Sequence, residues 1–313
     1  LVAARLAAGE LSVRMGATGQ DELALLGRSF NNMAQNLQDQ IEQLAELSRM
    51  QQRFVSDVSH ELRTPLTTIR MASEVLNDAR DSLDPNHRRS VELLYEQLDR
   101  FERLLADLLE ISRIDAGAVE LDTEPTDLVE LAHKVVALMN PIAEEGGCEL
   151  TVNAPSDPVM VEVDRRRVER IVRNLVINAI EHGEGAPITI EVGANNRACS
   201  LVVQDRGAGM TPTQAQHVFD RFWRADPARA RTLGGTGLGL AISYEDARLH
   251  GGDLEATGAP GRGARFRLTL PRRIGMSIEE AALPLHQPIE STPPPSPRDL
   301  DDPAALPSVE EES

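Results

Sequence analysis

The sequence predicts a multidomain protein in which an all-α helical hairpin precedes an α/β sandwich. Residues 1 to about 115 contain few strand-forming residues and place apolar residues at helical spacing. Residues 116–273 instead alternate β-branched runs with helical stretches, a pattern typical of an α/β sandwich. The change falls near Ala116-Gly117, where we expect the boundary between the two parts.

The helical hairpin is predicted from two apolar stripes. The first runs from Ile41 to Ile69 and the second from Val91 to Leu108. Between them Asp84-Pro85-Asn86 is a turn signal, so the two helices are expected to be antiparallel. Because a lone hairpin leaves much of its stripe uncovered, we expect it to pair with a second copy as a four-helix bundle. A further amphipathic helix, from Leu23 to Leu37, is expected ahead of it.

The α/β sandwich is predicted from the order of its elements. We expect strands at Met160–Val163, Ile188–Val192, Leu201–Gln204 and Arg265–Leu270, and helices at Leu128–Glu144, Arg165–His182 and Thr236–His250. The chain then divides into a truncated helical linker (1–48), the hairpin (49–115), the α/β domain (116–273) and a tail (274–313).

Charge is distributed unevenly along the chain. The 313 residues include 50 acidic and 32 basic ones, for a formal net charge of −18. This excludes nucleic acid as an expected partner, because a phosphate backbone binds surplus Lys and Arg. Residues 274–313 hold nine acidic residues, one arginine and eight of the 19 prolines. Such a segment cannot bury enough apolar surface to order itself, so we expect a disordered tail.

Three further features concern the setting of the protein. The sequence has no run of about 18–20 apolar residues, the length that crosses a bilayer. It begins at Leu1 rather than Met, so we expect it to be part of a longer protein. Cys148 and Cys199 lack metal-ligand spacing and a disulfide framework, which predicts buried thiols in a reducing, cytoplasmic setting.

The first hairpin helix contains a candidate nucleophile. His60 lies about 200° around the helix from Val58 and Leu62, at roughly 100° per residue, so it is expected to face solvent. A surface histidine alone has no special role. Glu61, however, can hold the ring through one nitrogen and leave the other free to attack. Pro65 should kink the helix one turn later.

A second group of polar residues lies on the helix predicted at 165–182. Asn174, Asn178, Glu181 and His182 recur at helical spacings, which places them on one face of an otherwise apolar helix. An asparagine oxygen suits Mg²⁺, which typically takes one or two protein ligands together with waters and phosphates. The alternative is the polar outer face of a core helix, and this motif alone leaves both open.

A third motif, Asp205-Arg-Gly207-Ala-Gly209, directly follows an apolar strand. Its glycines would let the backbone approach a flat ligand, and the carboxylate could accept a hydrogen bond from an exocyclic amine. An ordinary Asp-Gly turn is equally compatible with these residues taken alone.

The fourth motif is a glycine-rich segment that opens a helix. Its residues are Gly234, Gly235, Thr236, Gly237, Leu238, Gly239 and Leu240. Consecutive backbone N–H groups with the positive end of a helix dipole behind them favour phosphate binding. We expect residues 224–233 to form a mobile flap over a nucleotide, with Phe219, Phe222 and Trp223 as its hydrophobic anchor.

In order and in spacing, these segments resemble a sensor histidine kinase of the two-component type. Residues 54–66 resemble the H box, 170–182 the N box, 205–209 the G1 box, 218–223 the F box and 234–240 the G2 box, and residues 9–45 resemble a truncated HAMP module. The resemblance covers roughly residues 5–271. It implies a HisKA dimerisation hairpin followed by an ATP-binding sandwich of the GHKL (Bergerat) type.

The resemblance also implies an activity, ATP:protein-histidine phosphotransfer. His60 would accept the γ-phosphoryl group of ATP, with Glu61 as general base and Asn178 as the Mg²⁺ ligand. Asp205 would read the adenine amino group, and Thr64 would orient the water that removes phosphate from a bound regulator. Further nucleotide contacts are implied at Asn174, Glu181, His182, Gly207, Gly209, Phe222, Arg224, Gly235, Thr236, Gly237, Leu238, Gly239 and Leu240, where Glu181 would act through metal-bound water.

The implied partners are a second copy of the chain and the receiver domain of a response regulator. The implied location is the cytoplasmic portion of a protein that a missing N-terminal segment anchors in the cell membrane.

Two other function classes can be distinguished from this one by sequence. The first is an ATP-driven conformational machine of the same nucleotide fold, like the chaperone and mismatch-repair ATPases, which lack a motif such as His60–Pro65. The second is a dimeric signalling adaptor without catalytic activity, which would not need Asn178, Asp205 and the glycine loop to be intact.

Overall fold

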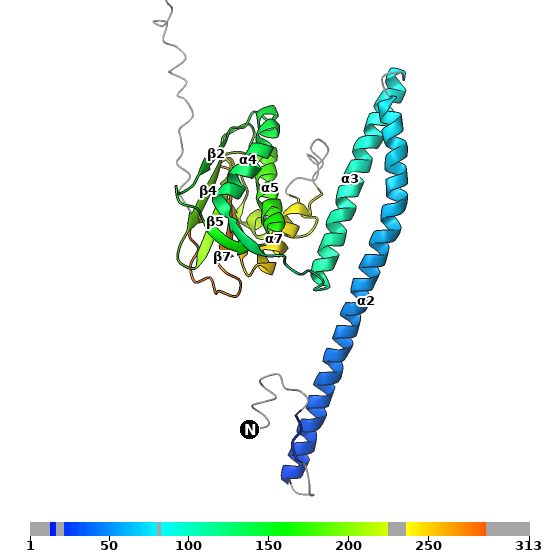
Figure 1. The fold of residues 1–313 in the computed structure, drawn as a ribbon, viewed down its shortest axis with the longest axis vertical. Helices are drawn as coiled ribbons and strands as arrows, with labels where there is room; N and C mark the ends of the chain where they lie inside the picture. Colours follow the sequence, from blue (N-terminus) through cyan, green and yellow to red (C-terminus); the bar gives the residue numbers. More distant parts are fainter. Residues whose placement is uncertain (1–12, 17–21, 80–82, 225–235, 286–313) are drawn as a thin grey trace, which may run out of the picture.

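A long helical hairpin forms the first part of the protein. The computed structural model describes residues 13–16, 22–79, 83–224 and 236–285. Helix α2 (Glu22–Asp78) and helix α3 (Pro85–Asp115) pack against each other, and α3 lies between α2 and the α/β domain (Figure 1). The helix expected at Leu23–Leu37 is continuous with the first hairpin helix, so α2 is one helix of 57 residues that runs on through Pro65.

The turn between the two helices has the predicted chemistry. The Asp84 carboxylate accepts hydrogen bonds from the N–H groups of Asn86 (3.0 Å) and His87 (3.2 Å), and Pro85 occupies the first helical turn. An acidic N-cap followed by proline is a common start of a helix, because proline has no N–H to leave unpaired there. Arg70 of α2 pairs with Glu102 of α3, which sets the register of the antiparallel hairpin.

The α/β domain has a five-stranded sheet in the order β2-β4-β5-β7-β6 and a small sheet of β1 and β3. Its elements are β1 (Glu124–Asp127), α4 (Leu128–Glu145), β2 (Leu150–Asn153), β3 (Met160–Val163), α5 (Arg165–His182), β4 (Ile188–Ala194), β5 (Ala198–Gln204), α6 (Pro212–His217), α7 (Gly239–Leu249), β6 (Asp253–Gly258) and β7 (Ala264–Pro271). Strand β2 is parallel to β4, and the other pairs are antiparallel. The four predicted strands and three predicted helices are confirmed, whereas β1, β2, β6 and α6 were not predicted.

Helix α5 and the central strands form the core of this domain. Ile171 and Leu175 of α5 are fully buried, as are Leu201 of β5 and Phe266 of β7. Both cysteines are buried, and desolvation raises the pKa of the Cys199 thiol to about 11, although Arg272 opposes the shift. Cys199 is therefore an inert core thiol at neutral pH, as the sequence predicts.

Residues 275–285, which we call the strap, cover the outer face of the sheet. Alternate side chains of β5 point to that face, where Ser200 and Val202 are both fully buried. The N–H of Ala282 donates to Ser200 Oγ at 3.0 Å. Leu283 packs over Gly193, where an added Cβ would lie 2.8 Å from its side chain.

The predicted start of the tail at residue 274 is wrong, because the strap contacts the sheet. We expected disorder from residue 274, but the guanidinium groups of Arg267 and Arg265 donate to the carbonyls of Leu283 (2.8 Å) and Pro284 (3.3 Å). These arginines are on strand β7, so local composition could not reveal the contact. Residues 286–313 of the predicted tail lie outside the described residues.

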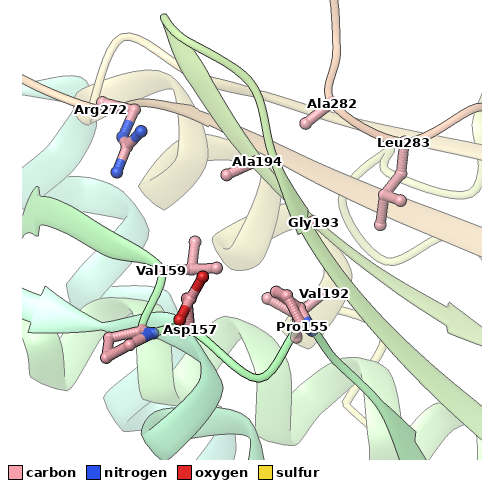
Figure 2. A pocket seen from close by; sticks show the side chains of 10 residues that line it. Pro155, Asp157, Val159, Val192, Gly193, Ala194, Arg272, Ala282 and Leu283 are labelled. Atoms are coloured by element: carbon pink, nitrogen blue, oxygen red, sulfur yellow. The ribbon is translucent and has the colours of Figure 1, made fainter.

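A cavity of about 560 Å³ lies beside the strap. Figure 2 shows Leu283, Gly193 and Asp157 around it, with Arg272 at its edge. The cavity adjoins the end of β4, whereas Asp205 follows β5 at the opposite end of the sheet, because Gln204 pairs with Thr189 at the start of β4. It is therefore separate from the predicted nucleotide site.

We expect the strap to stabilise the α/β domain. A chain that ends at Ile274 loses the packing of Leu283 over Gly193, and full burial of a leucine side chain is worth about 1.5–3 kcal/mol. At roughly 2–4 °C per kcal/mol for a domain of this size, the unfolding midpoint should fall by roughly 3–12 °C. The fluorescence of Trp223, the single tryptophan, measures it. A chain that ends at Leu285 should match the full chain, and equal midpoints for all three would contradict this role.

Candidate active site

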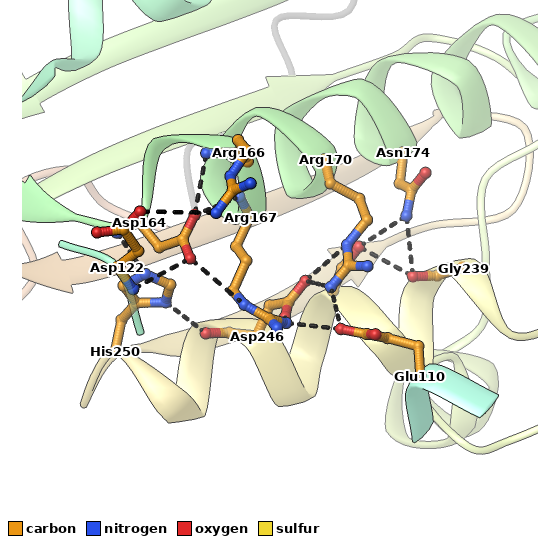
Figure 3. Close-up of polar contacts among 11 residues, drawn as sticks. Glu110, Asp122, Asp164, Arg166, Arg167, Arg170, Asn174, Gly239, Asp246 and His250 are labelled. Carbon is orange, nitrogen blue, oxygen red and sulfur yellow. Dashed lines mark hydrogen bonds and ion pairs between the residues drawn. The ribbon is translucent and has the colours of Figure 1, made fainter. Parts of the chain in front are cut away.

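The N-terminus of α7 is fixed to α5 by an asparagine. The side-chain nitrogen of Asn174 donates to the Gly239 carbonyl (3.2 Å) and to Ser243 Oγ (3.1 Å), as Figure 3 shows in part. Asn174 therefore positions the glycine-rich start of α7 through its amide nitrogen. The direct nucleotide contact expected of Asn174 from the sequence stays a prediction.

The polar face of α5 continues toward the C-terminus of the helix. Asn178 is half-buried one turn beyond Asn174, and Glu181 follows in a similar environment. Desolvation raises the pKa of the Glu181 carboxyl, while the positive charges of Arg224 and Arg103 lower it. His182 ends the helix with an exposed side chain. This end of α5 thus holds a partly desolvated carboxylate, a group that a bound cation would stabilise.

Asp205 is a buried carboxylate at the end of β5. Its Oδ1 accepts hydrogen bonds from the N–H groups of Gly207 (3.0 Å) and Ala264 (3.2 Å). Burial raises the pKa of Asp205, and these two hydrogen bonds and the charge of His182 oppose the rise. Within the described part of the chain no hydrogen bond to Oδ2 is recorded. The carboxylate is held rigidly by one oxygen, which suits it to bind a ligand through the other.

The glycines after Asp205 permit close packing of the protein on itself. A Cβ on Gly207 would lie 1.8 Å from the carbonyl oxygen of His182, and one on Gly209 would lie 2.0 Å from that of Ala259. Gly209 also has a φ of +67°. These glycines let the loop fit between the end of α5 and the turn at 259–263, while their contact with a flat ligand stays a prediction.

The start of α7 has the form of an anion site. No side chain of the described residues caps the helix at Leu238, so the first N–H groups inside α7 are available to a ligand, with the positive end of the helix dipole behind them. Thr236 Oγ1 accepts a hydrogen bond from the N–H of Leu238 (3.2 Å) and donates one to Asp107 Oδ2 of α3 (2.9 Å). Gly237 has a φ of +72°. Gly235 lies outside the described residues.

The leucines of this motif face inward. Leu238 is fully buried against Ile111 of α3 and Ile242 of α7, and Leu240 is half-buried against the core of the α/β domain. Phosphate contacts in this segment are therefore available from backbone N–H groups rather than from these side chains.

The predicted hydrophobic anchor is correct for two of its three residues. Phe219 stacks on Tyr244 with ring centroids 5.3 Å apart, and Trp223 packs against the core. Phe222 is wrong as an anchor, because its side chain is 60% exposed. Its backbone turns to a φ of +62° and its N–H donates to the Gly237 carbonyl (2.9 Å), so Phe222 supports the loop through its backbone. Of the flap predicted at residues 224–233, all but Arg224 lies outside the described residues.

The predicted catalytic residues lie on α2. Glu61 has an exposed side chain, and His60 and Thr64 occupy the same stretch of helix. The side chains of His60 and Thr64 lie outside the part of the chain that the structure describes. The hairpin register allows a rough placement: since Arg70 pairs with Glu102, His60 is opposite about Ser112 of α3.

Three acidic side chains of α3 that were not predicted from the sequence contact the α/β domain. Asp107 bonds to Thr236, Glu110 pairs with two arginines of α5, and Asp115 pairs with Arg221 at 2.6 Å. Desolvation raises the pKa of Asp107, although its bond to Thr236 opposes the rise. Their spacings of three and five along α3 did not distinguish them from solvent-facing acids.

Comparison with known families assigns the same three parts. Residues 163–274 match the family described as histidine kinase-, DNA gyrase B- and HSP90-like ATPase. Residues 50–117 match the His Kinase A (phospho-acceptor) domain, and residues 1–39 match the HAMP domain. The buried Asp205, the polar face of α5 and the start of α7 all lie within the ATPase match.

Individual relatives agree with these matches. The chain is 52% identical over 292 residues to the sensor histidine kinase MtrB of Mycobacterium leprae, and 53% identical over 284 residues to that of Mycobacterium tuberculosis. These alignments cover 93% and 91% of this chain but 52% and 50% of the relatives, so the chain spans about half their length. Full-length ShkA in complex with AMPPNP is 29% identical, with a TM-score of 0.63 over 74% of this chain and 47% of that one.

The buried carboxylate gives a test in which stability and binding change in opposite directions. Because the pKa of Asp205 is raised on folding, its contribution to stability is present at low pH and is lost as the pH rises through the folded-state pKa. Asp205→Asn should therefore unfold at an equal or higher temperature than the native chain at neutral pH, and the difference should vanish on acidification.

The same variant should bind a fluorescent ATP analogue with Mg²⁺ at least roughly tenfold more weakly, since a hydrogen bond to a charged group is worth about 1.5–3 kcal/mol. Asp157→Asn, at the opposite end of the sheet, is the control and should change neither property. Unaltered nucleotide affinity in Asp205→Asn would show that the carboxylate does not contact the base.

Proposed function

Because the chain belongs to the sensor histidine kinase family, we propose that it transfers the γ-phosphoryl group of ATP to His60. The observation that carries the proposal is the meeting of three features at one end of the α/β domain. These are the rigidly held Asp205, the polar face of α5 and the uncapped start of α7. Together they match the base, the metal and the phosphates of a nucleotide.

Each part of ATP has a candidate binding group. Asp205 accepts a hydrogen bond from the adenine amino group through Oδ2. The backbone N–H groups at the start of α7 bind the phosphates, with Gly237 shaping the loop. Asn178 is the protein ligand of Mg²⁺, which when bound neutralises charge on the transferring oxygens. Glu181, desolvated and with a raised pKa, supports the metal through bound water.

The chemistry at the hairpin is nucleophilic substitution at phosphorus. A ring nitrogen of His60 forms a bond to the γ-phosphorus, the bond from that phosphorus to the bridging oxygen breaks, and ADP leaves. Glu61 holds the other ring nitrogen and takes its proton. The exposed side chain of Glu61 is compatible with this role, since the phosphoacceptor must be reachable from outside the hairpin.

The hairpin also supports a homodimer. Large apolar side chains stay exposed in the single chain: Ile69 at 49% and Leu76 at 45% on α2, and Phe101 at 53% and Leu108 at 46% on α3. A second hairpin would cover them as a four-helix bundle, the arrangement of a HisKA dimerisation domain.

The phosphoryl group on the histidine requires an acceptor, and we propose the aspartate of a response regulator receiver domain, of the MtrA kind given the similarity to MtrB.

Among the described residues, no helix combines the length and apolarity needed to cross a membrane. We propose from the HAMP match that the complete protein is held in the cell membrane and that this portion faces the cytoplasm.

The decisive test of the phosphoacceptor uses Mg-ATP labelled at the γ-phosphate. The chain should acquire label that is labile in acid and stable in base, as a phosphorus–nitrogen bond is. His60→Gln should abolish the label. His87→Gln removes an exposed histidine of α3 instead and should leave labelling intact. Label that persists on His60→Gln would refute the assignment.

Thr64 gives a separate test of regulator dephosphorylation. Thr64→Ala should autophosphorylate at close to the native rate, because its hydroxyl is not part of the transfer step. The same variant should dephosphorylate a bound regulator at least roughly tenfold more slowly, since it can no longer orient the attacking water. The measurement is loss of phosphate from the labelled regulator, with Thr68→Ala as control. A native rate of loss would remove Thr64 from the mechanism.

A further inference from the structure

A cluster of charged side chains joins the α/β domain to the hairpin. Asp246 of α7 is fully buried and binds two arginines of α5 (Figure 3). Its Oδ1 accepts from Arg167 at 2.8 Å, and its Oδ2 accepts from Arg170 at 2.6 and 2.9 Å. The same two guanidinium groups reach Glu110 of α3, at 2.7 Å from Arg167 and 3.2 Å from Arg170.

The arrangement depends on the buried carboxylate. Arg167 and Arg170 lie on the same face of α5 one turn apart, and two like charges so close repel each other. Asp246 offsets one positive charge and fixes both guanidinium groups in place. Arg167 Nε also lies 3.6 Å from Asp164 Oδ2, so Glu110 is the third carboxylate around the two guanidinium groups and the one that comes from the hairpin. A buried carboxylate is costly unless it is paired in this way.

The frame around the cluster is also rigid. The Nε2 atom of His250 accepts a hydrogen bond from the backbone N–H of Asp164 at 3.0 Å, and its Nδ1 lies 2.7 Å from the carbonyl of Asp246. The Asp164 side chain caps α5 through the N–H groups of Arg166 and Arg167. These contacts fix the N-terminus of α5 to the C-terminal part of α7, and none of them involves α3.

The contact continues along α3 to the start of α7. One turn before Glu110, Asp107 accepts the hydrogen bond of Thr236, and Ile111 packs against Leu238 and Ile242. The helix that binds the arginines therefore also brings a carboxylate to the loop in which we expect the nucleotide phosphates.

We propose that Asp246 is a positioning residue that makes Arg167 and Arg170 into a carboxylate clamp for Glu110, and that closure of this clamp opposes the binding of Mg-ATP. The proposal rests on the proposed function, because it assigns the phosphates to the start of α7. In the closed state Asp107 faces that site with a negative charge and holds the hydroxyl of Thr236. Nucleotide phosphates and the docked α3 then compete for the same loop.

The competition must be reciprocal. If docking of α3 weakens nucleotide binding by some factor, nucleotide binding weakens docking by the same factor. The clamp thereby connects the position of the catalytic domain on the hairpin to the occupancy of its nucleotide site.

The test is Glu110→Gln in the complete chain, which keeps the shape of the side chain and removes its charge. We expect a fluorescent ATP analogue with Mg²⁺ to bind about 5-fold more tightly or better, the lower end of usual couplings between sites. Hydrogen exchange of residues 104–115 should rise as α3 is released. The control is Glu96→Gln, an exposed residue of the same helix, which should change neither quantity.

A second variant tests the positioning role of Asp246. Asp246→Asn should also tighten nucleotide binding, and the double variant with Glu110→Gln should add little, because both changes open the same clamp. Should Asp246→Asn fail to fold, Glu110→Gln still decides the proposal.

Failure of the clamp and failure of the proposed function give different results. Native affinity for the analogue in Glu110→Gln, with labelling of His60 intact in the native chain, would overturn the clamp alone. No binding of the analogue by the native chain would overturn the proposed function and the clamp with it.

Discussion

The two faces of helix α5 determine most of what this protein can do. One face packs its apolar residues into the core of the α/β domain, and the opposite face carries Arg167 and Arg170 near its start and Asn178 and Glu181 near its end. At about 1.5 Å of rise per residue, the two ends of this polar face are roughly 20 Å apart on one rigid rod. A single buried helix thus supports both the docking of the hairpin and the candidate nucleotide site.

Helix α7 is the element that these two sites share. Asp246 binds the arginines of α5, while Gly239 and Ser243, two turns and one turn earlier, bind Asn174. A shift of α7 along α5 would therefore alter the guanidinium pair and the phosphate loop together. This mechanical link is independent of the charge of Asp107.

Two carboxylates of the candidate nucleotide site lower the stability of the folded chain. The pKa values of Asp205 and Glu181 are both raised by burial, so both carboxylates destabilise the folded chain in their charged forms. The outer face of the sheet has the opposite character. There the strap, beyond residue 274 where the ATPase match ends, donates a hydrogen bond to Ser200 and accepts hydrogen bonds from Arg265 and Arg267. The strap thus adds contacts on the outer face of the sheet, while the candidate nucleotide site holds two desolvated carboxylates.

The sequence by itself determined the helices, the central strands, the turn at Asp84 and the position of the polar residues on α5, because each depends on a local period or on local turn chemistry. It did not predict the strands β1 and β2, because β1 (Glu-Pro-Thr-Asp) has no β-branched apolar residue and β2 (Leu-Thr-Val-Asn) has only one. Only the tertiary structure decided that Phe222 is exposed, that the strap covers the sheet, and that Glu110 and Asp107 of α3 meet the α/β domain. These contacts join residues far apart in the chain. Their existence depends on how whole surfaces pack, and no local pattern contains that information.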